Sequence, residues 1–106
     1  MTIAERLRIV PEFRPDEYDR ITEIVSGKLD RRLKRWDAEQ VELEISVKER
    51  DTDQQRVTLE CWIAGLPKLV ATSDERRLDD AVAAARDGLF TQIDTHLGKK
   101  EAARRR

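Results

Sequence analysis

Residues 41–48 alternate strictly between apolar and polar side chains, and this period of two constrains the possible folds more than any other feature of the chain. A β-strand points successive side chains to opposite faces. The stretch VELEISVK therefore places its apolar residues on one face and its polar residues, Glu42, Glu44, Ser46 and Lys48, on the other. Residues 56–64 alternate in the same way after a polar, turn-forming stretch at 51–54. The sequence predicts an antiparallel hairpin with one face buried in a core.

Two further strands and two helices are predicted around this hairpin. Residues 7–10 form a strand that is short or lies at a sheet edge, because the proline that follows cannot donate to a ladder. A helix is expected from 15 to 35, with a proline and two acids in its first turn. A shorter strand is expected at 68–72. A capping signature at 72–75 then begins a second helix, which ends at Gly98.

These elements follow one another in the order β-α-β-β-β-α, which predicts an α+β fold. Each strand has one apolar face, so we expect a four-stranded sheet with both helices packed on that face, as in double-stranded-RNA-binding domains. The opposite sheet face would be in solvent and rather acidic, through Glu42, Glu44 and Glu60. We expect one domain over residues 1–98, followed by a frayed basic tail at 99–106.

Composition limits the classes of function. Charged residues are 41% of the 106 residues and hydrophobic residues 39%, so a folded domain with a heavily charged surface is expected. The formal net charge of −1 argues against an indiscriminate nucleic-acid binder, and attraction to phosphate must come from local segregation of charge. Cys61 is the only cysteine, which excludes an internal disulfide and favours a reducing, cytoplasmic setting. No apolar run approaches the length of about 20 residues that spans a membrane.

The first predicted helix sorts its charges by face. At about 100° per residue, its apolar residues share one arc that would lie on the core. These are Tyr18, Ile21, Val25, Leu29, Leu33 and Trp36. The neighbouring arc is basic and supplies the candidate RNA-binding residues, which are Arg20, Lys28, Arg31, Lys34 and Arg35. Lys99 and Lys100 in the tail complete this candidate set.

Two details of this helix leave alternatives open. Its acids, Asp19, Glu23 and Asp30, lie farther round, whereas Arg32 falls inside the apolar arc. Arg32 must therefore either extend from the edge of the core to solvent or mark the place where the helix ends. The ordinary interpretation of the basic arc is a solvated surface, because charge-rich surface helices are common.

The second predicted helix carries less positive charge. Its apolar stripe consists of Leu78, Ala81, Val82, Ala85, Leu89, Ile93 and Leu97. Asp80, Asp87 and Asp94 repeat every seven residues, and we place them on the opposite side. Double-stranded-RNA-binding domains normally have a lysine cluster where this helix begins. Because acids follow Arg76 and Arg77 here, assignment to that class is not favoured.

The sequence offers little for catalysis. His96 is the only histidine and falls beside the apolar stripe, which favours a packed side chain, and no metal-ligand spacing is present. No nucleophile motif or glycine-rich phosphate loop appears. We therefore expect neither an enzyme nor a cofactor, metal or small-molecule substrate. Trp62 points to the solvated side of its strand, where it either packs across strands or stacks on a base or partner.

Three segments resemble the ribosome hibernation promoting factors, also called ribosome-associated translation inhibitors. Residues 28–36, KLDRRLKRW, are similar to a Lys-Leu-x-Lys-Leu pattern that ends in an aromatic residue in that family. Residues 64–71, AGLPKLVA, match its tight turn and short strand, and Leu89, Gln92 and Ile93 fit its Leu-x-x-Gln-Leu element. The resemblance covers residues 21–100 and agrees with the β-α-β-β-β-α order.

The resemblance implies a non-catalytic protein that binds the small ribosomal subunit and its rRNA in the channel used by mRNA and tRNA. Such a protein inhibits translation or stabilises idle ribosomes under stress. Lys28 and Arg31 match family basic residues, whereas Lys34 and Arg35 extend the patch by charge and position. The second helix departs from the family, because Asp94, Thr95 and Leu97 replace basic residues.

A hypothesis from another class uses the same scaffold. The solvent-facing sheet, with its glutamates and Trp62, would serve as a protein-protein interaction surface. The net charge of −1 and the sparse basic residues of the second helix favour this alternative. In either case we expect a monomer or a weak dimer with no membrane partner.

Overall fold

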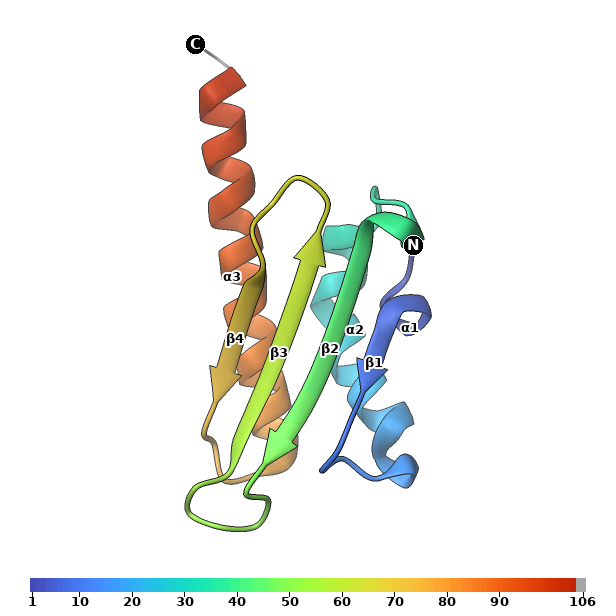
Figure 1. Ribbon diagram of the computed structural model, residues 1–106, viewed down its shortest axis with the longest axis vertical. Coiled ribbons are helices and arrows are strands. Elements are labelled where there is room, and N and C mark those ends of the chain that lie inside the picture. The colour runs from blue at the N-terminus through green and yellow to red at the C-terminus, as the bar shows by residue number, and fades with distance from the viewer. Residues whose placement is uncertain (105–106) are drawn as a thin grey trace.

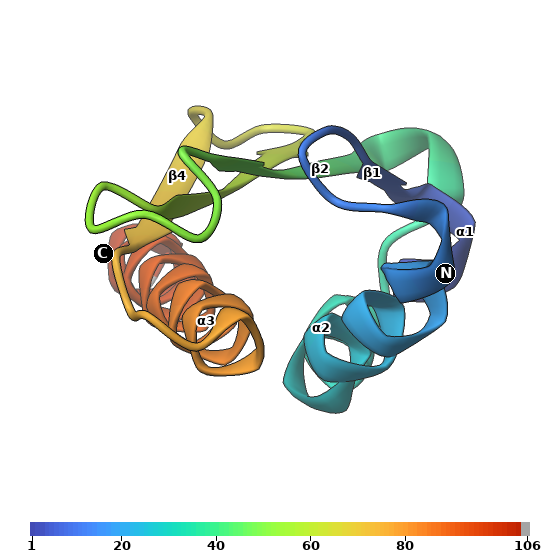
Figure 2. The same cartoon turned by 90° about the horizontal axis from the view of Figure 1, so that it is seen from below.

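The predicted hairpin lies at the centre of a four-stranded sheet in the computed structural model, which describes the backbone of residues 1–104 and the side chains of residues 1–98. The strands are β1 (Leu7–Ile9), β2 (Val41–Lys48), β3 (Arg56–Ile63) and β4 (Leu69–Ser73), in the sheet order β1-β2-β3-β4. β1 runs parallel to β2, and the other neighbours are antiparallel. Two long helices, α2 (Tyr18–Leu33) and α3 (Leu78–Arg104), lie side by side on one face of this sheet (Figures 1 and 2). The predicted α+β class and layer arrangement are confirmed.

The core forms between the apolar sheet face and these two helices. On β2 and β3, every second side chain is buried, as the alternation predicts. From α2 the buried residues are Ile21, Val25, Leu29 and Leu33, and from α3 they are Ala81, Val82, Ala85, Leu89, Ile93 and Leu97. At 37% exposure Tyr18 is largely outside the core, whereas Trp36 packs against it while partly buried.

α3 packs closely on the sheet at a glycine. A Cβ placed on Gly88 would lie 3.4 Å from the Cβ of Ala71 in β4. Only small residues at both positions let the helix approach the strand this closely. Gln92, one turn farther along α3, donates to the Val70 carbonyl on the edge of β4 at 2.7 Å. Helix and edge strand are therefore joined by packing and by a hydrogen bond.

The chain begins with a short helix that the sequence did not predict, α1 (Ile3–Arg6). Ile3 is fully buried, and its backbone N–H donates to Asp30 of α2 at 2.6 Å. Arg6 donates from Nε to the Val41 carbonyl at 2.8 Å. This hydrogen bond satisfies a backbone carbonyl on the edge of β2 at a residue that β1 does not pair with. A helix of four residues is too short to show hydrophobic periodicity, so no pattern indicated it.

Helix boundaries differ from the prediction in several places. A 3₁₀ turn, η1 (Pro15–Glu17), precedes α2, which ends at Leu33 rather than at residue 35. A second 3₁₀ turn, η2 (Ala38–Gln40), leads into β2. The predicted capping signature was wrong, because Thr72 and Ser73 still belong to β4 and α3 begins only at Leu78.

The predicted stop at Gly98 was also wrong, since α3 continues to Arg104. A glycine permits the left-handed conformation that ends many helices but does not impose it. The residues that follow, Lys-Lys-Glu-Ala-Ala-Arg, all favour helix. The side chains of the predicted tail, 99–106, lie outside the described residues.

Candidate nucleic-acid interface

Three of the predicted basic residues surround the carboxyl end of α2. Arg31 occupies the last turn, Lys34 is the C-cap and Arg35 follows it, and all three side chains are exposed. The guanidinium of Arg35 lies 4.5 Å from the centroid of the Trp36 ring, a cation–π distance. Basic residues at this end of a helix also interact favourably with its dipole. None of the three forms an ion pair with a side chain that the structure describes. We call these residues the α2-end cluster.

The other predicted basic residues of α2 are bound by acids of α3. Arg20 pairs with Asp79 at 3.1 Å, and Lys28 pairs with Asp87 at 3.0 Å. A third pair joins Arg32 to Asp94. We call these three contacts the interhelical ion pairs. Within the predicted basic flank, the charges of Arg20 and Lys28 are therefore compensated by acids of α3.

Helix geometry explains why the pairs repeat. α2 and α3 run in the same direction (Figure 1). Arg20 and Lys28 are separated by the same number of residues as Asp79 and Asp87, a rise of about 12 Å along each helix. Parallel helices therefore bring both pairs into register. Asp87 and Asp94, which were predicted to lie opposite the apolar stripe of α3, lie at its border with α2. Asp80 instead lies 3.8 Å from Arg77, the residue that precedes α3.

Arg86 of α3 fills the space between the helices at the middle pair. Its side chain is 17% exposed, and Nη1 donates to the Ile24 carbonyl of α2 at 3.0 Å. It also pairs with Asp87 at 3.0 Å, so that this carboxylate is shared with Lys28. Partial burial raises the pKa of Asp87, but hydrogen bonds from Lys28 and Arg86 outweigh this and hold the pKa below its ordinary value. The carboxylate stays charged and joins the helices.

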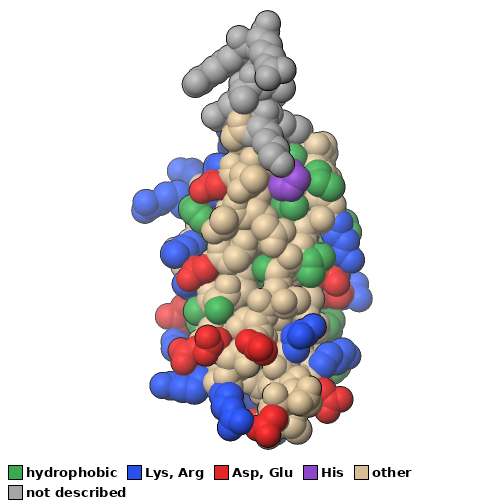
Figure 3. Space-filling view, turned by 90° about the vertical axis from the view of Figure 1, so that its left-hand side faces the viewer, with side chains coloured by type: hydrophobic (Ala, Val, Ile, Leu, Met, Phe, Trp, Pro, Cys, Tyr) green, Lys and Arg blue, Asp and Glu red, His purple; other side chains and the backbone are tan. Residues whose placement is uncertain are grey.

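The solvent-facing side of the sheet is less acidic than predicted. Glu42 pairs with Arg6 and Glu44 with Arg8, both at 3.2 Å, whereas Glu60 pairs with Lys68 at 3.4 Å. Every glutamate that made the predicted face acidic is thus compensated by a neighbouring cation. Viewed from the β4 edge, basic and acidic side chains alternate along both borders of the molecule (Figure 3).

Trp62 lies on this open sheet face, as the strand pattern predicts. It is 37% exposed, and Nζ of Lys68 lies 5.1 Å from the centroid of its ring. Part of the ring surface is therefore covered by a lysine of the same molecule, and the rest is available to a partner.

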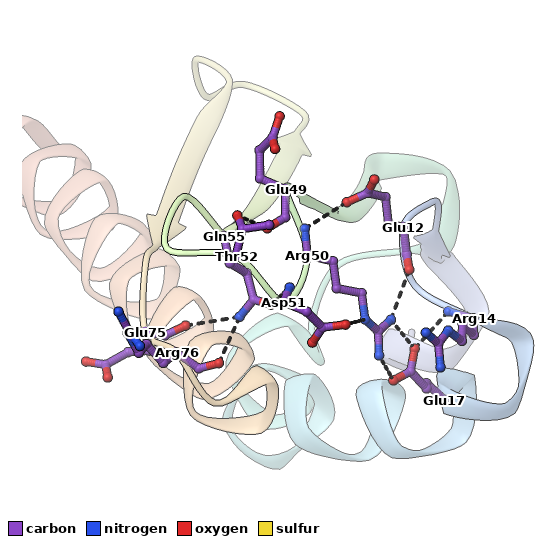
Figure 4. Close-up of polar contacts among 10 residues, drawn as sticks. All are labelled: Glu12, Arg14, Glu17, Glu49, Arg50, Asp51, Thr52, Gln55, Glu75 and Arg76. Atoms are coloured by element: carbon purple, nitrogen blue, oxygen red, sulfur yellow. Dashed lines mark hydrogen bonds and ion pairs between the residues drawn. The ribbon is translucent and has the colours of Figure 1, made fainter.

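A separate polar cluster at the opposite end of the molecule from the carboxyl end of α2 is structural, and we call it the Arg50 brace (Figure 4). Arg50, in the loop between β2 and β3, donates two hydrogen bonds to the Glu17 carboxylate and one to the Glu12 carbonyl. The hydrogen bond from Arg50 lowers the pKa of Glu17 to about 2. Gln55, which is buried, donates from the same loop to the carbonyls of Glu75 and Arg76. The brace joins the hairpin loop to the starts of both long helices.

The remaining candidate residues are placed as follows. His96 is half-buried, as expected for a packed histidine, and Cys61 is buried, which raises the pKa of its thiol to about 12. The side chains of Lys99 and Lys100 lie outside the described residues. Among the described residues no group of three or more His, Cys, Asp or Glu side chains could hold a metal ion.

Comparison of the chain with protein-family models found none that matches, and a search of curated proteins returned no match. Within the part of the chain that the structure describes, no helix is both long and apolar enough to cross a membrane.

Proposed function

We propose that this chain is a non-catalytic, cytoplasmic factor that binds the small ribosomal subunit through its rRNA. It would occupy the channel of mRNA and tRNA and keep idle ribosomes inactive or intact. The single observation that carries the proposal is the α2-end cluster, where three exposed cations project from one helix end. The β-α-β-β-β-α order and the resemblance at residues 28–36 support the same function.

The interhelical ion pairs narrow the surface that RNA would contact. Arg20 and Lys28 would have to leave Asp79 and Asp87 before they could bind a phosphate, so their charges contribute less. Arg31, Lys34 and Arg35 have no such competitor among the described side chains. Lys99 and Lys100 remain in the proposal on their sequence alone.

The α2-end cluster suits phosphate recognition by charge and shape. Arginine presents a planar fork that matches phosphate oxygens, and lysine adds a compact charge. Structured RNA is contacted largely through its backbone and 2′-hydroxyls, which such side chains reach without reading bases. Three phosphate contacts predict that the logarithm of the affinity falls with the logarithm of salt concentration with a slope of roughly −2 to −3.

Cosedimentation with purified small subunits across a salt series tests the proposal. The variant Lys34→Glu/Arg35→Glu is expected to bind at least about tenfold more weakly, because two attractive charges become repulsive. Arg76→Glu/Arg77→Glu is the matched control, since it makes the same charge change at the amino end of α3. The control is expected to change affinity less than about twofold.

Two results would contradict the proposal in different ways. Equal loss in both variants would mean that the total charge, and not the α2-end cluster, controls binding. Absence of binding by the unmodified chain at low salt would reject the ribosomal function itself. Circular dichroism of each variant before the binding assay distinguishes weak binding from loss of the fold.

A further inference from the structure

Gly27 lies in the middle of α2, at a position where the described fold does not require a glycine. It is exposed and stands between the buried residues Val25 and Leu29. The one described atom near a Cβ built there, outside the backbone of its own helix, is Nη1 of Arg86, at an ordinary contact distance of 3.7 Å. A glycine inside a helix is less favourable than an alanine. The chain therefore gives up helix stability at this position without a visible gain in packing.

The other two helical glycines have explanations within the fold. A Cβ on Gly88 would lie 3.4 Å from the Cβ of Ala71, where α3 packs on β4. Gly98 follows Leu97, the last buried residue of α3 among those described, and a glycine is common where the packed part of a helix ends. A helical glycine without such an explanation is typical of a place where a ligand approaches the backbone closely. Gly27 is such a glycine.

The exposed surface at Gly27 continues into the α2-end cluster. Positions four and seven residues apart share one face of a helix, so Arg31 lies one turn beyond Gly27 and Lys34 lies two turns beyond it. These separations correspond to roughly 6 and 10 Å along the helix axis. The glycine and the cluster therefore form one surface, in which two cations follow a stretch of bare helix backbone.

The charges beside Gly27 are positive in sum. Lys28 and Arg86 share the carboxylate of Asp87, which leaves one positive charge in excess. Nη1 of Arg86 donates to the Ile24 carbonyl, but a terminal guanidinium nitrogen carries two hydrogens, so one remains for another acceptor. An anionic group that lies on Gly27 would therefore come within reach of this guanidinium.

Acidic residues limit the positive surface on one side. Glu23 lies one turn before Gly27 on the same face, and its carboxylate is 3.9 Å from Arg20. Asp30 accepts a hydrogen bond from the backbone of α1, and the acids of α3 along this border belong to the interhelical ion pairs. The positive surface thus extends from Gly27 toward the carboxyl end of α2 and not toward its start.

We propose that the sugar–phosphate backbone of RNA lies against α2 at Gly27, with one phosphate in reach of Arg86 and the next contacts on Arg31 and Lys34. A polyanion with regularly spaced charges fits cations at successive turns of one helix face. This inference rests on the proposed function and adds a place of close approach and a further cation to the α2-end cluster. A side chain at position 27 would hold the RNA away from the helix and from Arg86.

Cosedimentation of Gly27→Ala and Gly27→Leu with small subunits across a salt series tests the inference. Both substitutions favour helix, so the melting temperature is expected to rise by roughly 2 to 6 °C. Affinity is nevertheless expected to fall, about twofold for the methyl group and about tenfold for the larger side chain, because the phosphate is held farther away. The salt slope of Gly27→Leu should be smaller by about 1, since one phosphate contact is lost.

Two further variants separate the contact from added bulk. Ala84 is exposed on α3, two residues before Arg86 and therefore about 200° round the helix from it. Ala84→Leu is the matched control and is expected to change affinity by less than about twofold, with an unchanged salt slope. Arg86→Met, added to Gly27→Leu, should weaken binding by no more than about twofold further, because both changes remove the same contact.

The possible failures are distinguishable. Unchanged affinity of Gly27→Leu, while Lys34→Glu/Arg35→Glu still binds weakly, would overturn this inference and leave the proposed function in place. Absence of binding by the unmodified chain would reject both. A weaker Gly27→Leu with a lowered melting temperature would also overturn the inference, because the glycine would then be required by the fold. Equal losses in Gly27→Leu and Ala84→Leu would do the same.

Discussion

The basic residues of α2 form two groups that differ in what surrounds them. Arg20, Lys28 and Arg32 lie along the border with α3, and each contacts an aspartate of that helix. Arg31, Lys34 and Arg35 lie at the helix end and contact no described acid. The same residue types thus stabilise the fold in one group and remain available to a partner in the other. A charge on a helix can be assigned a role only when the neighbouring element is known.

The Arg50 brace gives the largest expected effect and extends the comparison to charges that are half-buried. The side chains of Arg50 and Glu17, which form the ion pair of the brace, are 15% and 23% exposed. Both are less exposed than either side chain of the Lys28–Asp87 pair. Arg50→Met is expected to reduce the free energy of unfolding by about 2 to 3 kcal/mol, because Glu17 loses the partner of a partly buried charge. Urea denaturation monitored by circular dichroism measures this change. A loss below about 0.5 kcal/mol would place the brace among ordinary surface pairs.

The brace should also make stability depend on pH. The pKa of Glu17 is about 2 in the folded chain, below its ordinary value of 4.5. The unfolded chain therefore takes up the proton first, so the stabilisation is complete above about pH 4.5 and is lost as the pH falls toward 2. Glu17→Gln should remove this part of the acid dependence. Urea midpoints measured between pH 6 and pH 2 for both chains test the prediction.

Neutralising each group of α2 separately tests the comparison most directly. Arg31→Gln/Lys34→Gln/Arg35→Gln is expected to bind small subunits about tenfold more weakly and to change the free energy of unfolding by less than about 0.5 kcal/mol. The matched variant, Arg20→Gln/Lys28→Gln/Arg32→Gln, removes the same charge. It should lose about 1 to 2 kcal/mol of stability, because three aspartates lose their partners. Similar behaviour of the two variants would remove the distinction between the groups.

Removing the aspartates of α3 should make the paired cations of α2 available to RNA, as those of the α2-end cluster are. Asp79→Asn/Asp87→Asn/Asp94→Asn leaves the cations of the interhelical ion pairs in place without their partners. Affinity for small subunits at low salt is then expected to rise by about threefold or more, with a steeper salt dependence, since more phosphates can be contacted. An unchanged salt slope in the cosedimentation series would mean that RNA does not reach this border.

The smallest effect is expected at Gly27, which lies beside Arg86 on the same border. A Cβ there would lie 3.7 Å from Nη1 of Arg86, an ordinary contact. Gly27→Ala should therefore stabilise the chain by about 0.5 to 1 kcal/mol through helix propensity. Thermal denaturation measures the gain. Destabilisation would show that Arg86 needs more space than a methyl group leaves.

The sequence predicted the layers of the fold well because periodicity reports burial directly. Residues 41–48 alternate and α2 repeats its apolar residues every three or four positions, so the buried face of each element was determined locally. The ends of the helices were less predictable, because a glycine such as Gly98 permits a helix to end without requiring it. The short helix α1 gave no periodic signal at all.

The candidate site was predictable only in part because its electrostatics are non-local. The helical wheel of α2 located the cations, but their acids lie far along the chain, 59 positions away for Arg20 and 62 for Arg32. The side-by-side placement of α2 and α3 decides which charges meet. Arg32, inside the apolar arc, was expected to extend outward or end the helix, and it extends to Asp94. Single residues in loops, such as Arg50, carried no pattern that could have indicated the brace.

Cys61 gives the chain a chemical reporter of its own opening. Its side chain is fully buried in β3, and burial raises the pKa of the thiol to about 12. Alkylating reagents attack the thiolate, so the folded chain is protected both by exclusion of the reagent and by the scarcity of thiolate. The rate of alkylation then measures how often the chain opens far enough to expose the centre of the sheet. Variants of this chain could all be ranked by this rate in native buffer, without denaturant and without an added label.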